Sequence, residues 1–162
     1  MIHFPVVDYM KVCLGGTFDL LHDGHKRLIM TACDLAGPSG TVLIGITKGN
    51  LAAKQRTITS YQKRKEAIEA FLYKEKAIPH VVLTPIQDKY GPSVEEEFDA
   101  IVVSPETKST AEEINAQRRQ RGKKQLQIVV VPYVLAKDGY PISSTRIRNG
   151  EIDEHGTLRE KE

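Results

Sequence analysis

Two histidines three residues apart, His22 and His25, follow a glycine pair and a short apolar run near the start of the chain. The order is residues 12–14 (Val-Cys-Leu), 15–19 (Gly-Gly-Thr-Phe-Asp) and 20–25 (Leu-Leu-His-Asp-Gly-His). A strand that leads through glycines into a helix is typical of phosphate sites, because a helix N-terminus offers unpaired N–H groups and the positive end of its dipole. Imidazoles there can add charge-assisted hydrogen bonds to an anion. The segment therefore predicts a nucleotide site.

The same two histidines could instead form half of a metal site. Zinc sites usually take three or four ligands from the protein. The remaining histidines, His3, His80 and His155, form no obvious set with His22 and His25. We therefore expect no metal ion held by side chains of this chain, and we assign the pair to anion binding.

A second cluster with anion-binding residue types lies near the other end of the chain, in Ile142-Ser143-Ser144-Thr145-Arg146-Ile147-Arg148. Hydroxyl side chains ahead of a helical run are also typical of an ordinary N-cap. Hydroxyls, helix N–H groups and two arginines at one helix start would together form a strong cradle for phosphates. Arg146 and Arg148 are two positions apart, so they point to different faces of a helix.

Apolar runs alternate with helical patterns along the chain, and these elements must position both clusters. Val, Ile and Leu follow one another in the apolar runs, which is typical of strands covered on both faces in a parallel sheet. We expect a single Rossmann-like, doubly wound α/β domain with a five-stranded parallel sheet, whose ligands bind beyond the carboxyl ends of the strands. The expected strands are 11–14, 41–47, 80–84, 100–103 and 126–131, and the expected helices are 24–36, 60–72 with Ser60 as N-cap, 110–122, and one that begins near Ser143.

The 162 residues are enough for one domain that buries about 70% of its unfolded surface. Cys13 and Cys33 lie among apolar residues, so we expect buried thiols. Residues 1–10 show neither a basic start nor a long apolar core, and no run approaches the roughly 20 apolar residues that span a bilayer. We therefore expect a cytoplasmic protein with no membrane partner. We expect one domain over residues 1–150 and a charged, partly disordered tail over 151–162.

Charge is unevenly distributed, although the formal net charge is only +2. Residues 94–107 carry acidic side chains and no basic one, whereas residues 118–124 include Arg118, Arg119 and Arg121. A basic run can bind nucleic acid, but no aromatic residues are interleaved here to stack on bases. We expect the run to be the solvated end of a helix, where cations suit the C-terminal dipole, and we expect no nucleic-acid partner.

Taken whole, the string from Gly15 to His25 resembles the Gly-Thr-Phe-Asp…His-x-Gly-His signature of the nucleotidyltransferase superfamily. Residues 142–148 resemble the Ile-Ser-Ser-Thr-x-x-Arg motif that holds the β- and γ-phosphates of ATP in adenylyltransferases. Cytidylyltransferases typically carry Arg-Thr-x-Gly-Ile-Ser-Thr-Thr instead. Enzymes that make NAD usually carry Phe-Asn-Pro or Phe-Gln-Pro where this chain has residues 18–20 (Phe-Asp-Leu).

Three middle segments narrow the resemblance. Residues 51–54 (Leu-Ala-Ala-Lys), 88–92 (Asp-Lys-Tyr-Gly-Pro) and 102–107 (Val-Val-Ser-Pro-Glu-Thr) are similar to the phosphopantetheine adenylyltransferase of archaea and the matching domain of eukaryotic CoA synthase. The bacterial enzymes of this activity differ. They carry Thr where this chain has His22, and an Ile-Arg-Gly-x-Arg segment where it has residues 103–106.

This resemblance implies a step of coenzyme A biosynthesis, in which AMP moves from ATP to 4′-phosphopantetheine and yields 3′-dephospho-CoA and pyrophosphate. The acceptor phosphate is already ionised at neutral pH, so we expect direct in-line attack without a covalent intermediate. The resemblance assigns the ATP phosphates at the reacting centre to His25 and His22, and a histidine beside phosphate oxygens is expected to be protonated. Ser143, Ser144, Thr145 and Arg148 are expected to hold the leaving pyrophosphate.

Thr17 is expected to keep the acceptor phosphate and the α-phosphate in register. Lys54 is expected to hold the acceptor phosphate, with Lys48 and Arg56 as alternatives. Asp19 is expected to brace the turn, and Mg²⁺ to arrive with ATP on the triphosphate. The remaining residues of the expected nucleotide site are Gly15, Gly16, Phe18 and Gly24.

Two other functions stay open at this point. One is another nucleotidyltransferase, whose acceptor is FMN, NMN or a glycerol phosphate. The other is a nucleotide-binding regulator that has lost catalysis, against which the intact His-x-Gly-His argues. Pyrophosphate release measured with each acceptor in turn distinguishes them.

Overall fold

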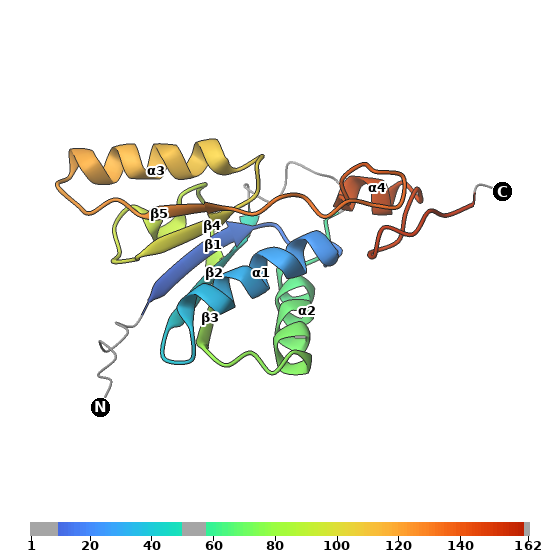
Figure 1. Cartoon of the computed structure of the whole chain (residues 1–162), viewed down its shortest axis with the longest axis horizontal. Coiled ribbons are helices and arrows are strands. Elements are labelled where there is room, and N and C mark those ends of the chain that lie inside the picture. Colours follow the sequence, from blue (N-terminus) through green and yellow to red (C-terminus); the bar gives the residue numbers. More distant parts are fainter. Residues whose placement is uncertain (1–9, 50–57, 161–162) are drawn as a thin grey trace, which may run out of the picture.

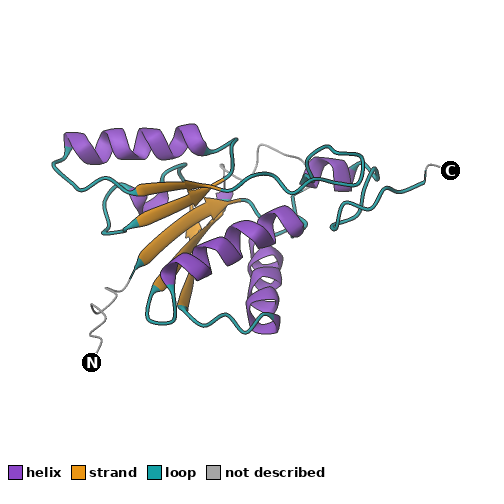
Figure 2. Cartoon of the chain, in the orientation of Figure 1, coloured by secondary structure: helices purple, strands orange, loops and turns teal. Residues whose placement is uncertain are grey.

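A computed structural model describes residues 10–49 and 58–160 of the chain, which form a parallel sheet with helices on both faces (Figures 1 and 2). The elements in chain order are β1 (Lys11–Gly16), α1 (Asp23–Ala36), β2 (Thr41–Thr47), α2 (Tyr61–Lys74), β3 (His80–Ile86), the short 3₁₀ helix η2 (Gly91–Ser93), β4 (Ala100–Val103), α3 (Lys108–Gln120), β5 (Gln127–Val130) and α4 (Ser144–Arg148).

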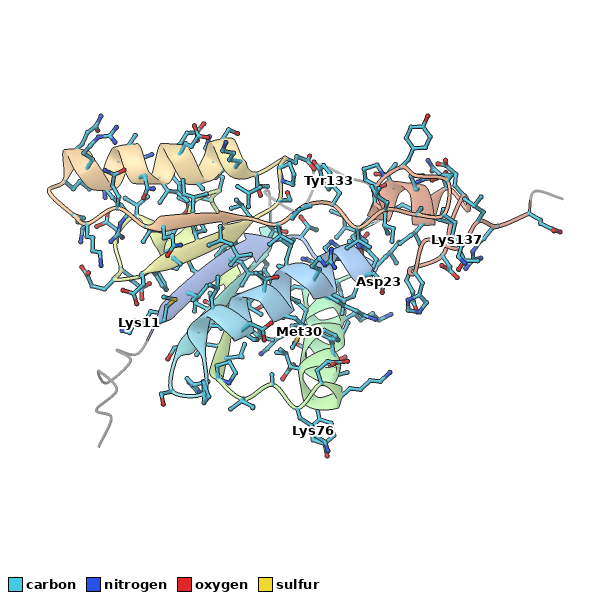
Figure 3. The ribbon with its side chains drawn as sticks, viewed as in Figure 1. Lys11, Asp23, Met30, Lys76, Tyr133 and Lys137 are labelled. Carbon is cyan, nitrogen blue, oxygen red and sulfur yellow. The ribbon has the colours of Figure 1, made fainter. Side chains whose placement is uncertain are left out.

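The five strands lie in the order β3-β2-β1-β4-β5, and every pairing is parallel. Helices α1 and α2 cover one face, α3 covers the other, and α4 lies beyond the carboxyl ends of the strands (Figure 1). The predicted doubly wound α/β fold is therefore confirmed. In such a fold the connections diverge on either side of a central pair, here β1 and β4, and ligands bind in the crevice at that point. Figure 3 shows Lys11, at the start of β1, on the side of the sheet away from α4, whereas Asp23 and Tyr133 lie nearer to α4.

Side chains along β1 point alternately to the two faces of the sheet, and each face has its own apolar core. Val12 and Leu14 pack with Ile29 of α1 on one face, while Cys13 packs with Ile114 of α3 on the other. The predicted buried thiols are confirmed. Burial raises the pKa of Cys13 to about 12 and that of Cys33 to about 11, so neither is a thiolate at neutral pH.

Two strands continue beyond their predicted ends. Gly15 and Gly16, expected in the turn, pair with β2 and belong to β1, so the turn begins at Thr17. Strand β3 runs past its predicted end at residue 84 through Pro85 to Ile86. A proline fits there because β3 is an edge strand, whose outer side needs no N–H donor.

The sequence predicted that the basic run at residues 118–124 lies in solvent, but the structure buries part of it. Arg118 is 0% exposed. Its guanidinium donates to the carbonyl oxygens of Ser93 (3.0 Å), Glu96 (2.7 Å) and Lys124 (2.7 Å). Arg118 therefore attaches α3 to the segment at the end of η2 and just after it. The number of charges along the helix does not reveal this role.

Residues 151–160, part of the expected charged tail, are packed against the preceding loop. Ile152 is 0% exposed and joins Ala136 and Ile142 in a small third core. An antiparallel bridge links Ile152 to Leu158. The domain boundary at residue 150 stays a prediction. None of the helices within the described ranges is long and apolar enough to cross a membrane.

Candidate active site

Two neighbouring cavities open at the carboxyl ends of the strands. The larger, of about 470 Å³, we call the histidine cavity, because His22 and His25 line it together with residues 143–145 and Arg148. The smaller, of about 240 Å³, we call the apolar cavity, because Leu43, Ile101, Val103 and other side chains from the sheet line it. Thr17 borders both cavities. The two sequence motifs thus meet around one space, at the crevice between β1 and β4.

His22 caps α1 with its own side chain. Its Nδ1 accepts from the backbone N–H of Gly24 (3.1 Å) and of His25 (3.4 Å). In return, Nδ1 of His25 accepts from the backbone N–H of His22 (3.3 Å), which completes a capping box made of two imidazoles. The glycine between them is required, because a Cβ on Gly24 would lie 2.9 Å from Cε1 of the His22 ring.

This cap leaves the start of α1 without the free N–H groups that we expected for an anion. The remaining donors of the first turn are also taken, by the carbonyl oxygens of Glu154 (to Asp23 N–H, 3.0 Å) and of His22 (to Lys26 N–H, 3.0 Å). Since Nδ1 of each ring is an acceptor, each neutral ring carries its proton on Nε2. The two rings are stacked, with centroids 3.7 Å apart. The donors offered to a ligand are therefore the Nε2–H groups.

Burial controls the protonation of the pair. Loss of solvation lowers the pKa of His22 to about 4, an effect that Asp23 opposes and Lys26 reinforces. Loss of solvation lowers the pKa of His25 to about 3, reinforced by His22 and opposed by Asp19. Both rings are therefore neutral at pH 7 in the ligand-free protein. The protonated ring stays a prediction for the ATP-bound form, in which phosphate oxygens would raise these values.

Asp19 joins the first motif to the second. It is 3% exposed, its Oδ2 accepts from Nη2 of Arg148 (2.8 Å), and its backbone oxygen accepts from Oγ of Ser144 (2.6 Å). Its Oδ1 accepts from the N–H and the hydroxyl of Thr59. Burial alone would raise the pKa of Asp19, but these hydrogen bonds outweigh it and lower the pKa below its usual range. Asp19 is thus a buried carboxylate that orients Arg148.

The turn that carries Asp19 has a strained backbone, and hydrogen bonds from α2 and β2 hold it in place. Phe18 (φ 54°) and Leu20 (φ 50°) adopt left-handed conformations that cost non-glycine residues roughly 1–2 kcal/mol each. Arg64 of α2 donates through Nη1 to the carbonyl oxygens of Thr17 (2.9 Å) and Thr47 (2.8 Å). The hydroxyl of Thr47 also donates to that of Thr17 (3.0 Å). These contacts fix Thr17 between the two cavities.

The remaining predicted residues divide between the cavities. Phe18 and Gly24 line the histidine cavity with the two histidines, while Gly15 and Gly16 line the apolar cavity. The turn after β4 also serves both, because Ser104 lines the histidine cavity and Thr107 the apolar cavity.

Of the three cationic residues predicted to bind the acceptor phosphate, the structure describes one. Lys54 and Arg56 lie outside the described residues. Lys48 is exposed, with its Nζ 5.2 Å from the centroid of the Tyr61 ring. The choice among the three stays a prediction.

The side chains in view do not fit a magnesium ion held by the protein. Among the described residues, no three His, Cys, Asp or Glu side chains are grouped closely enough to hold a metal. Both carboxylate oxygens of Asp19 are already hydrogen-bonded to Thr59 and Arg148.

Comparison with known proteins agrees with this geometry. A family model described as cytidylyltransferase-like matches residues 13–150. A phosphopantetheine adenylyltransferase of Methanosarcina mazei is 48% identical over 153 residues, which cover 93% of this chain and 98% of that protein. The chain belongs to the phosphopantetheine adenylyltransferase family. A further member of this family, from Archaeoglobus fulgidus, is 42% identical over 151 residues, covering 92% of this chain and 99% of its own length.

Solved structures place the phosphopantetheine adenylyltransferase fold in a wider group. A protein of unknown function from Archaeoglobus fulgidus, 38% identical, superposes with a TM-score of 0.67 over 75% of this chain and 89% of its own. A lipopolysaccharide core biosynthesis protein from Thermoplasma volcanium, only 19% identical, gives 0.57 over 75% of this chain and 95% of its own. The second likeness shows the fold alone.

Sequence reasoning missed several residues that build this site. Arg64, Thr47 and Thr59 lie 17 to 47 residues from the groups they hold, and no local pattern singles them out. The segment 88–92, noted for its family resemblance, turns out to supply Lys89, Tyr90 and Pro92 to the apolar cavity. Residues 102–107, noted for the same resemblance, supply Val103 and Thr107 to this cavity.

Proposed function

We propose that this chain transfers AMP from ATP to 4′-phosphopantetheine, and so produces 3′-dephospho-CoA and pyrophosphate in coenzyme A biosynthesis. Membership of the phosphopantetheine adenylyltransferase family over nearly the whole chain supports the reaction. The observation that carries this proposal is the position of Thr17 at the junction of two cavities. A reaction between the phosphates of two substrates needs a cavity for each substrate. The cytoplasmic location stays a prediction.

ATP would occupy the histidine cavity. The Nε2–H groups of His22 and His25 would donate to phosphate oxygens around the α-phosphorus, where negative charge builds up during in-line attack. Ser143, Ser144, Thr145 and Arg148 would hold the departing pyrophosphate. Arg148 lines this cavity and is oriented there by the hydrogen bond from its Nη2 to Asp19, which supports a ligand oxygen beside this guanidinium.

The acceptor would occupy the apolar cavity, with its phosphate at Thr17 and its arm against the apolar walls. Its phosphate is ionised at neutral pH, so no general base is needed and no covalent intermediate forms. The residues act by positioning the two phosphates and neutralising charge. Lys54 remains our choice for the acceptor phosphate. Mg²⁺ would enter as a complex with the triphosphate.

The direct test is pyrophosphate release from ATP with 4′-phosphopantetheine, compared with FMN, NMN and glycerol 3-phosphate, and with CTP replacing ATP. Release only with CTP, or only with another acceptor, would overturn the proposal. His25→Ala should lower kcat by at least about 100-fold, the scale of one lost preorganised contact. His80→Ala, which removes an exposed histidine at the start of β3, should leave kcat unchanged.

A further inference from the structure

Ile86, the last residue of β3, forms a wall of the apolar cavity and lies over three glycines. A Cβ on Gly45 would lie 2.9 Å from Cγ2 of Ile86, and one on Gly91 only 2.8 Å from the same atom. A Cβ on Gly15 would lie 3.5 Å from Cδ1 of Ile86. The Ile86 side chain therefore occupies the space that side chains from β1, β2 and η2 would otherwise fill.

The backbone around Ile86 is held in place. Its carbonyl oxygen accepts from the N–H of Lys48 (2.9 Å), and Ile86 pairs with Thr47 in the last register position of the sheet. Beneath the side chain lies the backbone of paired strands, because Gly15 and Gly45 face each other across β1 and β2. A β-branched side chain also has restricted χ1 freedom. Ile86 can therefore move aside very little when a ligand enters.

The segment above Ile86 is equally constrained. Tyr90, which also lines the cavity, donates its hydroxyl to Oε2 of Glu113 on α3 (2.9 Å). Arg118 of the same helix binds the carbonyl oxygen of Ser93 at the end of η2 (3.0 Å). With α3 itself forming the opposite wall through Ala111 and Ile114, the cavity has little room to widen.

We propose that Ile86 is a specificity-determining residue that sets the width of the acceptor cavity, and so excludes acceptors whose arm is bulkier than that of 4′-phosphopantetheine. This inference rests on the proposed function, which assigns the apolar cavity to the acceptor. At about 240 Å³ the cavity lies below the usual range of ligand pockets, roughly 300–1,000 Å³. The loss of a few buried methyl groups is therefore a large fractional change in the space available.

The test compares two acceptors in the full-length protein: 4′-phosphopantetheine, and a phosphorylated pantothenamide that carries a branched alkyl group in place of the thiol end. Ile86→Ala should shift the ratio of the two kcat/KM values toward the branched acceptor by about tenfold or more, the low end of what one or two methylenes discriminate. KM for ATP should not change. Ile86→Val should shift the ratio in the same direction by less, and serves if the alanine variant does not fold.

Ile46→Ala is the matched control, because it removes the same atoms from β2 but from the core that faces α1 and α2. It should destabilise the protein without changing acceptor preference. An unchanged acceptor ratio in both Ile86 variants would overturn the inference, as would an equal shift in Ile46→Ala. Absence of turnover of 4′-phosphopantetheine by the unaltered chain would overturn the proposed function itself, and it is seen before any variant is made.

Discussion

Acidification from pH 7.5 to pH 5.0 should destabilise this protein through His22 and His25. In the unfolded chain a histidine has a pKa of about 6.5, whereas burial lowers these two in the folded protein to about 4 and about 3. Below pH 6.5 the unfolded state therefore binds more protons than the folded state. The stability that the neutral rings contribute is complete above pH 6.5, and is lost as the pH falls toward the folded values.

The size of the loss at pH 5.0 depends mainly on the unfolded pKa, because both folded values lie below 5.0. A difference of 1.5 pH units at about 1.4 kcal/mol each is worth about 2 kcal/mol for one histidine, and about 4 kcal/mol for the pair. The carboxylates with lowered pKa values, such as Asp19, protonate at lower pH and contribute little in this window. The capping box gives the structural reason, since a proton on Nδ1 would remove the acceptor for the first turn of α1.

The free energy of unfolding should be measured by urea titration at both pH values, in buffers without phosphate so that no anion fills the site. His25→Gln is the informative variant, because glutamine can still accept from the His22 N–H at this position of a capping box. It should lose only about 2 kcal/mol between the two pH values. His80→Gln, at an exposed site, should lose as much as the unaltered protein. A loss below about 1 kcal/mol in the unaltered protein, or an equal loss in His25→Gln, would refute the assignment.

Two further predictions concern buried charge. Asp19→Asn keeps an acceptor for Thr59 but turns an amide toward Arg148. The KM for ATP should therefore rise about tenfold, the scale of one charged hydrogen bond. Steady-state kinetics with ATP varied would check this value, and an unchanged KM would contradict the role given to Arg148. Arg118→Leu leaves several buried carbonyl oxygens unpaired and should lower the free energy of unfolding by about 3 kcal/mol or more, measured by urea titration at pH 7.5. A change below about 1 kcal/mol would show that water replaces the guanidinium.

Much of the fold follows from local pattern. Continuous apolar runs such as 41–47 identify strands covered on both faces, and β2 has those same bounds. Ser60 and Ser143 cap their helices as expected, accepting from the N–H groups of Lys63 and Arg146. These features depend on residues within a few positions of one another, so a single sequence is enough to predict them.

Other features of the site depend on contacts between distant segments. Nothing near Asp23 indicates that its N–H would be bound by the carbonyl oxygen of Glu154, so the expectation of an open helix N-terminus was wrong. The burial of Arg118 depends on carbonyl groups 22 to 25 residues earlier in the chain. The order of the strands brings these pairs together, and no short-range periodicity reports it.

The sequence by itself determined that strands and helices alternate, that two motifs typical of phosphate sites lie after β1 and at α4, and that the chain resembles an adenylyltransferase. Only the tertiary structure decided how the candidate site is arranged. It turned Nδ1 of His22 and His25 inward as caps and left Nε2–H for the ligand. It also placed Thr17 between two cavities and Ile86 over glycines from three elements. The physical reason is that side-chain type and spacing specify local conformation, whereas cavity shape, burial and pKa depend on which distant segments the sheet order packs together.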